Sequence, residues 1–569
     1  MAKKAANLVY GVDDTPPLTV AALLGLQHVV VLTSGWVLVV VIVTTIGGTP
    51  EEVTNVLRMS MIASGIATIV QSLHQSPVGS GFLCPIGSGP AYVSASILAG
   101  RTGGLSAIFA MTALSGFFEG LLGRIVPRLR ALFPPEVTGL VVTMVGMELV
   151  ALACPRFLGF QEGGTSLTGS VAAVATVTLA AMIGPTVWGK GKLKLYPVLV
   201  GLFVGYVLAY FAGALHTDRL QDMFDASMFS LPRKVQGGWS LHLSLLPAFL
   251  IASLASTLKS VGDLTLCQKI NDADWKRTDM QSVRGGIYAG AIGTGLSGLL
   301  GGIGQSTFSS NVGLSLATGA TSRSIAVACG ILMILLAFLP KLAAFFAVMP
   351  DPVMGAILVY VACYMILAGI QVITSRMLDA RRTFVVGIAL IFGLSVDMVP
   401  GLYRDVPDAI QPLFSSSLSI STVLVVLLNL LFRIGITKRR SLELTPGVDG
   451  SQKIFEFMET QGSIWGARRE VIMRATAALN EFVESAAALG FVRGSAVADV
   501  SFDEFNLDLD IRYAGTLMEF PSRRPTAEAL LADDSGVAGL SGFLIRQYAD
   551  RVKTEHENGR CRISMHFDH

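Results

Sequence analysis

Two charged side chains lie one helical turn apart in an apolar stretch of the sequence, and their chemistry is that of binding. Lys259 and Asp263 are spaced i and i+4, so a helix would place them on one face. Ionisable groups within a membrane segment are costly and are usually functional. Two interpretations stay open. Lys259 contacts a solute or a coupling ion, or the two residues form an internal ion pair.

Other side chains that could bind a solute stand in runs that are otherwise apolar. His28 follows Gln27 in the first such run. A lone histidine on an apolar face is typical of packing, and a binding role is the alternative. Phe82 lies in a Gly-rich segment, where its ring would either stack on a planar solute or only pack.

A later run is interrupted by polar residues, and it holds further candidates for contact with a solute. Phe308, Ser309 and Ser310 are candidates for direct contact with the solute. Asn311 is expected to be mainly architectural, tying this segment to a neighbouring helix. Gly313 follows in the same interrupted run.

The sequence shows no pattern that would support a reaction. There is no pairing of a nucleophile with a base, no phosphate loop and no metal cluster, so we expect no enzyme, no cofactor and no bound metal. The six cysteines are scattered and form no Cys-x-x-Cys pair, which indicates free thiols.

The composition places most of the chain in lipid. Of 569 residues, 52% are hydrophobic and only 14% are charged, whereas about a quarter are charged in a typical soluble domain. The mean hydropathy is +0.62. A net charge of +2 gives no basic field for nucleic acid. Residues 1–17 lack a signal-peptide core, so we expect the first apolar run to be kept as a span.

Apolar runs long enough for a bilayer of about 30 Å recur along the chain. We expect about fourteen, at 17–47, 52–73, 79–99, 103–123, 135–154, 166–188, 195–215, 242–268, 283–303, 306–319, 322–346, 352–374, 380–400 and 415–435. The third and the tenth are rich in Gly, Ser and Pro. Interrupted segments at matching places in two halves indicate an inverted-repeat carrier with its site near the midplane.

We therefore predict an all-α polytopic membrane protein with a small α/β domain after it. Lys and Arg gather in the loops on the side of the two termini, which predicts cytoplasmic termini in the cell (inner) membrane. After Lys438 the composition becomes that of a soluble domain. The expected parts are an N-terminus (1–16), a transporter domain (17–435), a linker (436–460) and a cytoplasmic domain (461–569).

The cytoplasmic domain has its own periodicity. It predicts a helix, two strands, two helical segments and a last strand, at about 467–488, 497–503, 506–513, 525–532, 538–552 and 560–567.

Several separated motifs resemble the nucleobase-ascorbate transporter family of uracil, xanthine and urate permeases. They are Gly25-Leu26-Gln27-His28, Leu132-Phe133-Pro134-Pro135, Gly146-Met147-Glu148-Leu149, Ser260-Val261-Gly262-Asp263, Asn311-Val312-Gly313 with Thr318, and Met349-Pro350-Asp351-Pro352-Val353-Met354-Gly355.

The resemblance implies fourteen spans as a 7+7 inverted repeat with a core and a gate domain. It implies short antiparallel strands in segments 3 and 10, which meet near the substrate. Phe308, Ser309 and Ser310 would then lie on the second strand itself. It also implies dimerisation and an elevator-like movement of the core. By the same resemblance Gln27 and His28 lie close to the site, while Asp263, Asn311, Gly313 and Thr318 have a coupling or structural role beside it.

Two positions depart from the family's pattern. Lys259 stands where many members have a carboxylate, and Ser310 stands where the signature usually begins with Glu or Gln. A lysine offers donors and positive charge. It therefore favours a carbonyl-rich or anionic solute, such as urate, the xanthine anion or a different organic anion.

The end of the chain resembles the ATPase-like domain of anti-sigma factors and histidine kinases. The run from Gly536 to Val552 carries this likeness, as does the helix that holds Glu481. Four residues after Glu481, the family's metal-binding Asn is replaced by Ser485, and the loop that should hold Asp-x-Gly reads Tyr-Ala-Gly at 513–515. ATP hydrolysis is therefore not expected, and regulation, partner binding or dimer stabilisation is.

The function predicted from the sequence is secondary transport of a nucleobase-like solute. One alternative is a carrier for an unrelated small organic or inorganic anion, and another is a membrane sensor whose tail signals occupancy. Expected partners are the solute, a coupling cation (H⁺ or Na⁺), the lipid bilayer, a second copy of the chain and a cytoplasmic regulatory protein. No nucleic acid is expected.

Overall fold

The structure is a computed structural model that divides into two compact units. Residues 1–373 with 386–427 form the first unit, and 374–385 with 428–569 form the second. The structure describes residues 4–5, 8–74, 77–125, 134–160, 169–189, 196–215, 224, 227–233, 238–273, 275, 278–374, 378–399, 401–403, 405–407, 411–414, 416–432, 438–503, 506–525, 534–557 and 560–568.

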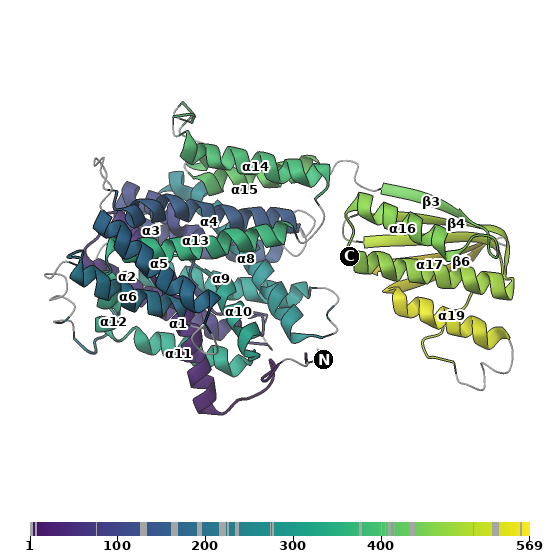
Figure 1. Cartoon of the computed structure of the whole chain (residues 1–569), viewed down its shortest axis with the longest axis horizontal. Coiled ribbons are helices and arrows are strands. Elements are labelled where there is room, and N and C mark those ends of the chain that lie inside the picture. Colours follow the sequence, from purple (N-terminus) through teal and green to yellow (C-terminus); the bar gives the residue numbers. More distant parts are fainter. Residues whose placement is uncertain are drawn as a thin grey trace. The chain divides into compact units, whose positions relative to one another are not determined.

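The chain before the tail is built almost entirely of helices (Figure 1). They are α1 (Leu18–Thr45), α2 (Pro50–Gln71), α3 (Val93–Ile125), α4 (Pro135–Leu158), α5 (Gly169–Val187), α6 (Pro197–Phe211), α8 (Leu246–Asn271), α9 (Met280–Leu300), α10 (Ser309–Thr318), α11 (Arg323–Leu336), α12 (Pro340–Ala347), α13 (Asp351–Ile373), α14 (Ala380–Met398) and α15 (Ser417–Leu431). Short 3-10 turns add η1 (Pro90–Tyr92), η4 (Leu243–Leu245) and η5 (Gln411–Phe414).

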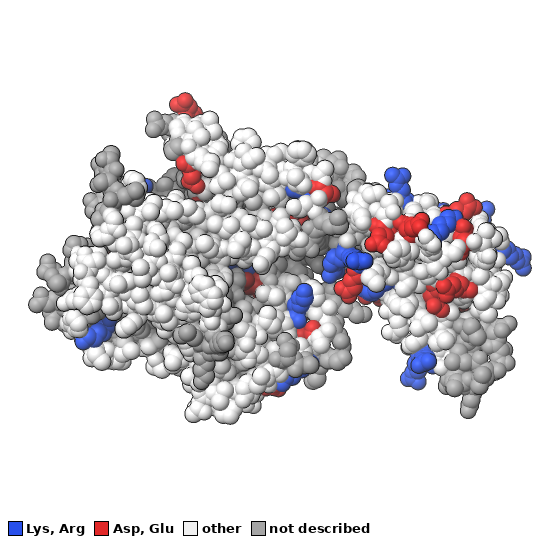
Figure 2. All heavy atoms as spheres, in the orientation of Figure 1, with Lys and Arg blue, Asp and Glu red and all other residues white. Residues whose placement is uncertain are grey.

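Seven of the described helices are long and apolar enough to cross a membrane, and α11 with α12, bent by 82°, would make an eighth. The face of the first unit seen in Figure 2 is accordingly almost free of charged side chains. This supports a multi-pass membrane protein. The count of about fourteen spans stays a prediction, because α6 and α15 are shorter apolar helices and two expected spans contain strands.

Glycines let helices of the first unit approach closely. Helices α4 and α13 lie side by side (Figure 1). A Cβ on Gly139 would lie 2.7 Å from the carbonyl oxygen of Gly369, and one on Gly369 would lie 2.2 Å from Oγ1 of Thr143. Small residues at such contacts are typical of helix pairs in membranes, where close packing replaces the hydrophobic effect.

The two interrupted segments contain the expected short strands. Strand β1 (Ile86–Ser88) pairs antiparallel with β2 (Gln305–Thr307), with Ile86 opposite Thr307 and Ser88 opposite Gln305. The antiparallel pair predicted for segments 3 and 10 is thus confirmed. The third and fourth expected spans meet inside α3, where Gly103 and Gly104 leave the helical conformation and Gly104 has a φ of 67°.

The N-terminal segment before α1 is bound to the end of α10. Tyr10 forms a β-bridge with Ala320, and the amide of Thr321 donates to the carbonyl of Tyr10 at 2.8 Å. The guanidinium of Arg323 pairs with Asp13 at 2.6 Å and donates from Nε to the Gly81 carbonyl at 2.8 Å. Residues 8–14 therefore form a strap over the junction between α10 and α11.

The second unit contains an antiparallel sheet of five strands in the order β3-β4-β5-β7-β6. The elements are β3 (Lys438–Leu444), α16 (Ser451–Trp465), α17 (Arg469–Leu489), β4 (Val492–Phe502), β5 (Asn506–Gly515), α19 (Asp534–Tyr548), β6 (Arg551–Glu557) and β7 (Arg560–Asp568). Alternate side chains of β4, β5 and β7 form the core with α16 and α17, where Trp465 stacks on Phe502.

Two expectations for this unit are wrong. The range 436–460 is not a linker, because it contains β3 and most of α16. Strand β3 pairs with β4 along its whole length and buries Leu444. Because the strand begins with three charged residues, its sequence does not show the apolar alternation typical of a strand. The helix expected to reach 552 ends at Tyr548, because Arg551–Glu557 pairs with β7 as β6. The expected helical segment at 525–532 lies mainly outside the described residues.

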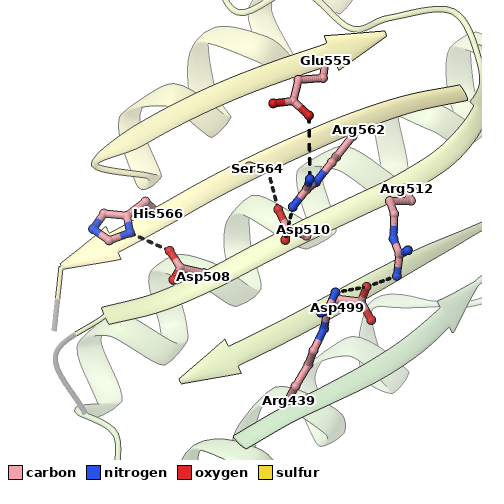
Figure 3. A network of polar contacts seen from close by, with 9 residues as sticks. All are labelled: Arg439, Asp499, Asp508, Asp510, Arg512, Glu555, Arg562, Ser564 and His566. Atoms are coloured by element: carbon pink, nitrogen blue, oxygen red, sulfur yellow. Dashed lines mark hydrogen bonds and ion pairs between the residues drawn. The ribbon is translucent and has the colours of Figure 1, made fainter. Parts of the chain in front are cut away.

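The sheet face opposite the core carries a network of charges (Figure 3). Asp499, only 3% exposed, receives hydrogen bonds from Ser441 and from the guanidinium groups of Arg439 (2.8 Å) and Arg512. Burial alone would raise the pKa of Asp499, but these three donors outweigh burial and hold it below its usual range. Ion pairing at this carboxylate therefore stabilises the unit at neutral pH.

We predict that Asp499→Asn lowers the stability of the second unit at pH 7 by about 1–3 kcal/mol, because two charge-assisted hydrogen bonds are weakened. The pKa of Asp499 is depressed by folding, so its contribution is complete above the pKa of the unfolded chain, about 4, and is lost as the pH falls through the folded value. Urea unfolding followed by the fluorescence of Trp465, in a full-length chain without its other tryptophans, measures this.

The difference in unfolding free energy between the unmutated protein and Asp499→Asn should become smaller below pH 4. Glu456→Gln is the control, since Glu456 lies exposed on α16. A gap of the same size at every pH would contradict the assignment.

Candidate functional site

Polar side chains of three helices satisfy the backbone of the strand pair. Oγ1 of Thr68 on α2 accepts from the amide of Ile86 at 3.0 Å. Thr294 on α9 and Ser256 on α8 donate to the carbonyl of Gln305 at 3.2 and 3.3 Å. The side chain of Gln305 is in turn bound by Ser64 on α2, at 2.5 Å. These contacts hold α2, α8 and α9 to the strands, as a non-helical backbone surrounded by apolar side chains requires.

Lys259 and Asp263 meet beside the end of β2. Nζ of Lys259 lies 3.0 Å from Oδ2 of Asp263, and both side chains are 8% exposed. Nζ also donates to the carbonyl oxygen of Thr307. Oγ1 of Thr307 donates to Asp263 at 2.6 Å and lies 3.3 Å from Oγ of Ser260. The internal pair therefore exists in this structure, and it also reaches the broken segment.

The ring of Phe308 fills a space between α1 and β1. A Cβ on Gly35 would lie 2.7 Å from Cζ of Phe308, and one on Gly87 would lie 3.0 Å from Cε2. Only glycine leaves room for the ring at these two places. Nζ of Lys259 lies 5.9 Å from the ring centroid, within the range of a cation–π contact.

The first turn of α10 is open to a ligand. The amides of Ser309 and Ser310 form no hydrogen bond within the described residues, and Phe308 at the N-cap offers no side-chain acceptor. Ser309 is half-buried and Ser310 is exposed. The prediction that Ser309 and Ser310 lie on the strand is wrong. Both lie in α10, because β2 ends at Thr307. Free amides at a helix N-terminus favour a carbonyl oxygen or an anion.

His28 and Asn311 form a buried contact between α1 and α10. Nδ1 of His28 donates to Oδ1 of Asn311 at 2.9 Å, since an amide oxygen only accepts. Nδ2 of Asn311 and Oε1 of Gln27 are buried and have no hydrogen-bond partner among the described residues. The contact agrees with the architectural role expected for Asn311. It gives His28 the same role, because the hydrogen bond joins α1 to α10.

Three other candidate residues have different surroundings. Phe82 is partly buried and packs against an apolar cluster that includes Leu264 and Cys267 of α8. A Cβ on Gly313 would meet nothing within 4 Å. Thr318 donates to the carbonyl of Leu314 at 2.9 Å, one turn back in its own helix. Of the predicted site residues, the structure brings together Lys259, Asp263 and Phe308.

Three buried carboxyl groups of the first unit were assigned no role from the sequence, those of Glu119, Glu136 and Glu148. Glu119 on α3 accepts from the hydroxyl of Tyr92 at 2.8 Å, and Tyr92 also contacts Ser253 at 3.2 Å. Glu148 lies buried on α4. Each is a lone ionisable residue in an apolar run, the same signal that singled out Lys259. Glu148 was noticed only as part of a motif.

The arrangement is suited to binding a polar solute. An ammonium group, two free amides, hydroxyl groups and one aromatic ring gather where two broken segments meet. The charges of Lys259 and Asp263 offset each other, so the remaining field is that of the amides at the start of α10. In the described residues no group of three or more His, Cys, Asp and Glu side chains could hold a metal ion.

Comparison with known proteins gives three likenesses. The model of the permease family matches residues 20–402. A Clostridium perfringens protein named as a purine permease is 31% identical over 424 residues, 74% of this chain and 92% of that protein. The Escherichia coli xanthine permease XanP is 25% identical over 451 residues, 75% of this chain and 95% of its own length.

Among solved structures, the murine anion transporter solute carrier 26 family member A9, in its inward-facing state, superposes with a TM-score of 0.50. The sequence identity is 9%, and the match covers 75% of this chain and 70% of that chain. At this identity the likeness concerns the fold alone.

The buried pair predicts a non-additive response to mutation. Lys259→Met should lower stability by about 3–5 kcal/mol, because it leaves the Asp263 carboxylate buried without its cation, and adding Asp263→Leu should restore much of the loss. Thermal unfolding of the purified protein in detergent measures both. Lys453→Met is the matched control, because Lys453 forms an exposed i,i+4 pair with Asp449 at 2.9 Å. A Lys259→Met protein as stable as the unmutated one would contradict the pair's role.

Proposed function

The chain belongs to the permease family, and from this premise we propose that it carries a nucleobase-like solute of the xanthine, urate or uracil class across a membrane. Members of a permease family are transporters and not enzymes. The relatives named above as purine and xanthine permeases support this substrate class.

The observation that carries the substrate proposal is the donor-rich site around Lys259. Its ammonium group and the free amides of Ser309 and Ser310 all present N–H donors. The ring carbonyls of oxidised purines and of uracil accept such bonds, and the Phe308 ring can stack on a planar base. A site without a free carboxylate favours an anionic or carbonyl-rich base over one that must donate.

Transport is proposed to follow an elevator-type movement of a core against a gate. The hydrogen bonds that join α2, α8 and α9 to the strand pair support this, because they bind the site into one rigid group. We further propose an inverted repeat of about fourteen spans, a homodimer, both termini in the cytoplasm and the cell (inner) membrane as its location. A coupling cation, H⁺ or Na⁺, belongs to the same proposal.

A carrier for an unrelated small anion is the second candidate, and two observations favour it. Lys259 supplies positive charge where many members of the family have a carboxylate. The amides of Ser309 and Ser310 at the start of α10 add further N–H donors. The chemistry of free amides and an ammonium group serves inorganic anions as well as bases.

The second unit gives the third candidate, a solute sensor. Its sheet covered by helices on one face supports the likeness to ATPase-like domains, and Glu481 and Ser485 both lie on α17. Asn in the place of Ser485 would be needed for a bound metal, so we propose a domain that regulates or recruits a cytoplasmic partner without hydrolysing ATP.

Uptake into proteoliposomes tests these proposals. Labelled xanthine, urate and uracil should accumulate, and unlabelled xanthine should compete with its own uptake. Lys259→Glu should reduce the affinity for an anionic base about 10- to 100-fold, because an attractive charge-assisted bond becomes repulsive. Uptake of small anions only would favour the second candidate. Binding without uptake under every gradient would favour the sensor.

The packing of Phe308 gives a second, independent test. Gly35→Ala places a methyl group against the ring, so the ring must move and base binding should fall at least tenfold. Gly184→Ala on α5 is the matched control, since a Cβ there meets open space, and it should leave binding unchanged. Thermal-shift titration with xanthine measures both proteins. Equal affinities would show that Phe308 is not part of the site.

A further inference from the structure

A buried carboxyl group lies on α4, away from the Lys259 cluster. Glu148 is 7% exposed, and its Oε1 atom has no hydrogen-bond partner among the residues that the structure describes. Neither the motif that contains it nor the proposed solute contacts give it a task. A buried polar atom without a partner is uncommon and calls for an explanation.

Glu148 lines a small cavity where four parts of the first unit meet. The cavity has a volume of about 10 Å³, which is room for about one water molecule. Three hydroxyl-bearing residues share it with Glu148: Ser94 in the first turn of α3, and Ser416 and Ser419 at the start of α15. The rest of its wall is apolar and comes from η1, α3, α8 and α15.

The charges around Glu148 do not compensate an ionised carboxylate. The hydroxyl groups of Ser94 and Ser416 donate to the carboxyl group but carry no charge, and Asp397 on α14 acts on it with the same sign. Within the described residues, no Lys, Arg or His lines the cavity. On α8, Lys259 lies seven residues beyond Ala252, and it is paired with Asp263. Burying an ionised carboxylate without a cation is prohibitively costly, and the group binds a proton instead.

We propose that Glu148 is a proton-binding site between α4 and α15 on one side and α3 and α8 on the other. With the interface closed, the proton is bonded to a carboxyl oxygen, and the neutral group needs no counter-ion. When the interface opens to water, the O–H bond breaks, the proton passes to water and the carboxylate is solvated. One proton is thus carried per opening. This second half rests on the proposed transport function, whereas the protonation of the closed state does not.

Infrared difference spectroscopy on the full-length protein in lipid tests the closed state at neutral pH. The spectrum of the unmutated protein minus that of Glu148→Gln should contain the C=O band of an un-ionised carboxylic acid. Ser416→Ala keeps the carboxyl group and should shift this band without removing it, which covers the case of a Gln variant that does not fold. A difference spectrum with carboxylate bands only would overturn the proposal.

Transport assays test the movement of the proton, with xanthine as the probe. A pH gradient should drive xanthine accumulation by the unmutated protein. In Glu148→Gln this accumulation should fall at least tenfold, whereas the exchange of internal for external xanthine should continue. Gradient-driven accumulation that survives in Glu148→Gln would overturn the proposal. If the unmutated protein carries no xanthine, the substrate proposal fails, and the infrared result alone decides the state of Glu148.

Discussion

Every polar backbone group that leaves a helix inside an apolar layer must find a partner within the protein, and the first unit is organised around this constraint. The chain breaks its helices at Ile86–Ser88 and at Gln305–Thr307, where the two strands pair with each other. Their remaining groups are satisfied by Thr68, Ser256, Thr294 and Lys259 from three helices. The break frees the amides at the start of α10. The cost of interrupting two helices and the capacity to bind a solute thus have one origin.

Lys259 shows how one residue serves both sides of this arrangement. Its Nζ atom pairs with the carboxylate of Asp263 and also donates a hydrogen bond to the carbonyl oxygen of Thr307. Lys259 therefore stabilises the structure even when no solute is bound. A solute that engages the ammonium group must compete with, or share, these two partners. Affinity at this site is therefore a difference between two sets of hydrogen bonds, and the choice of cargo depends on how well the solute replaces the carbonyl.

The sequence was sufficient for features that rest on local composition. Gly, Ser and Pro in two apolar runs marked the interrupted segments, and the family resemblance implied the strand pair in them. The i,i+4 spacing put Lys259 and Asp263 on one helix face and left their pairing as one of two interpretations. It failed where tertiary pairing decides. Nothing local in 551–557 shows that β7 will pair with it as a strand, and the glycines that admit the Phe308 ring, Gly35 and Gly87, lie far from Phe308 in sequence.

The strap formed by residues 8–14 has a practical consequence for anyone handling the protein. It is hydrogen-bonded to Gly319, Thr321 and Arg323, which follow α10, and Arg323 also donates to the carbonyl of Gly81 in the other broken segment. An affinity tag or fluorescent protein fused to the amino terminus would therefore be attached close to contacts with both broken segments. Purification tags are better placed after β7, whose partners lie in a different folding unit.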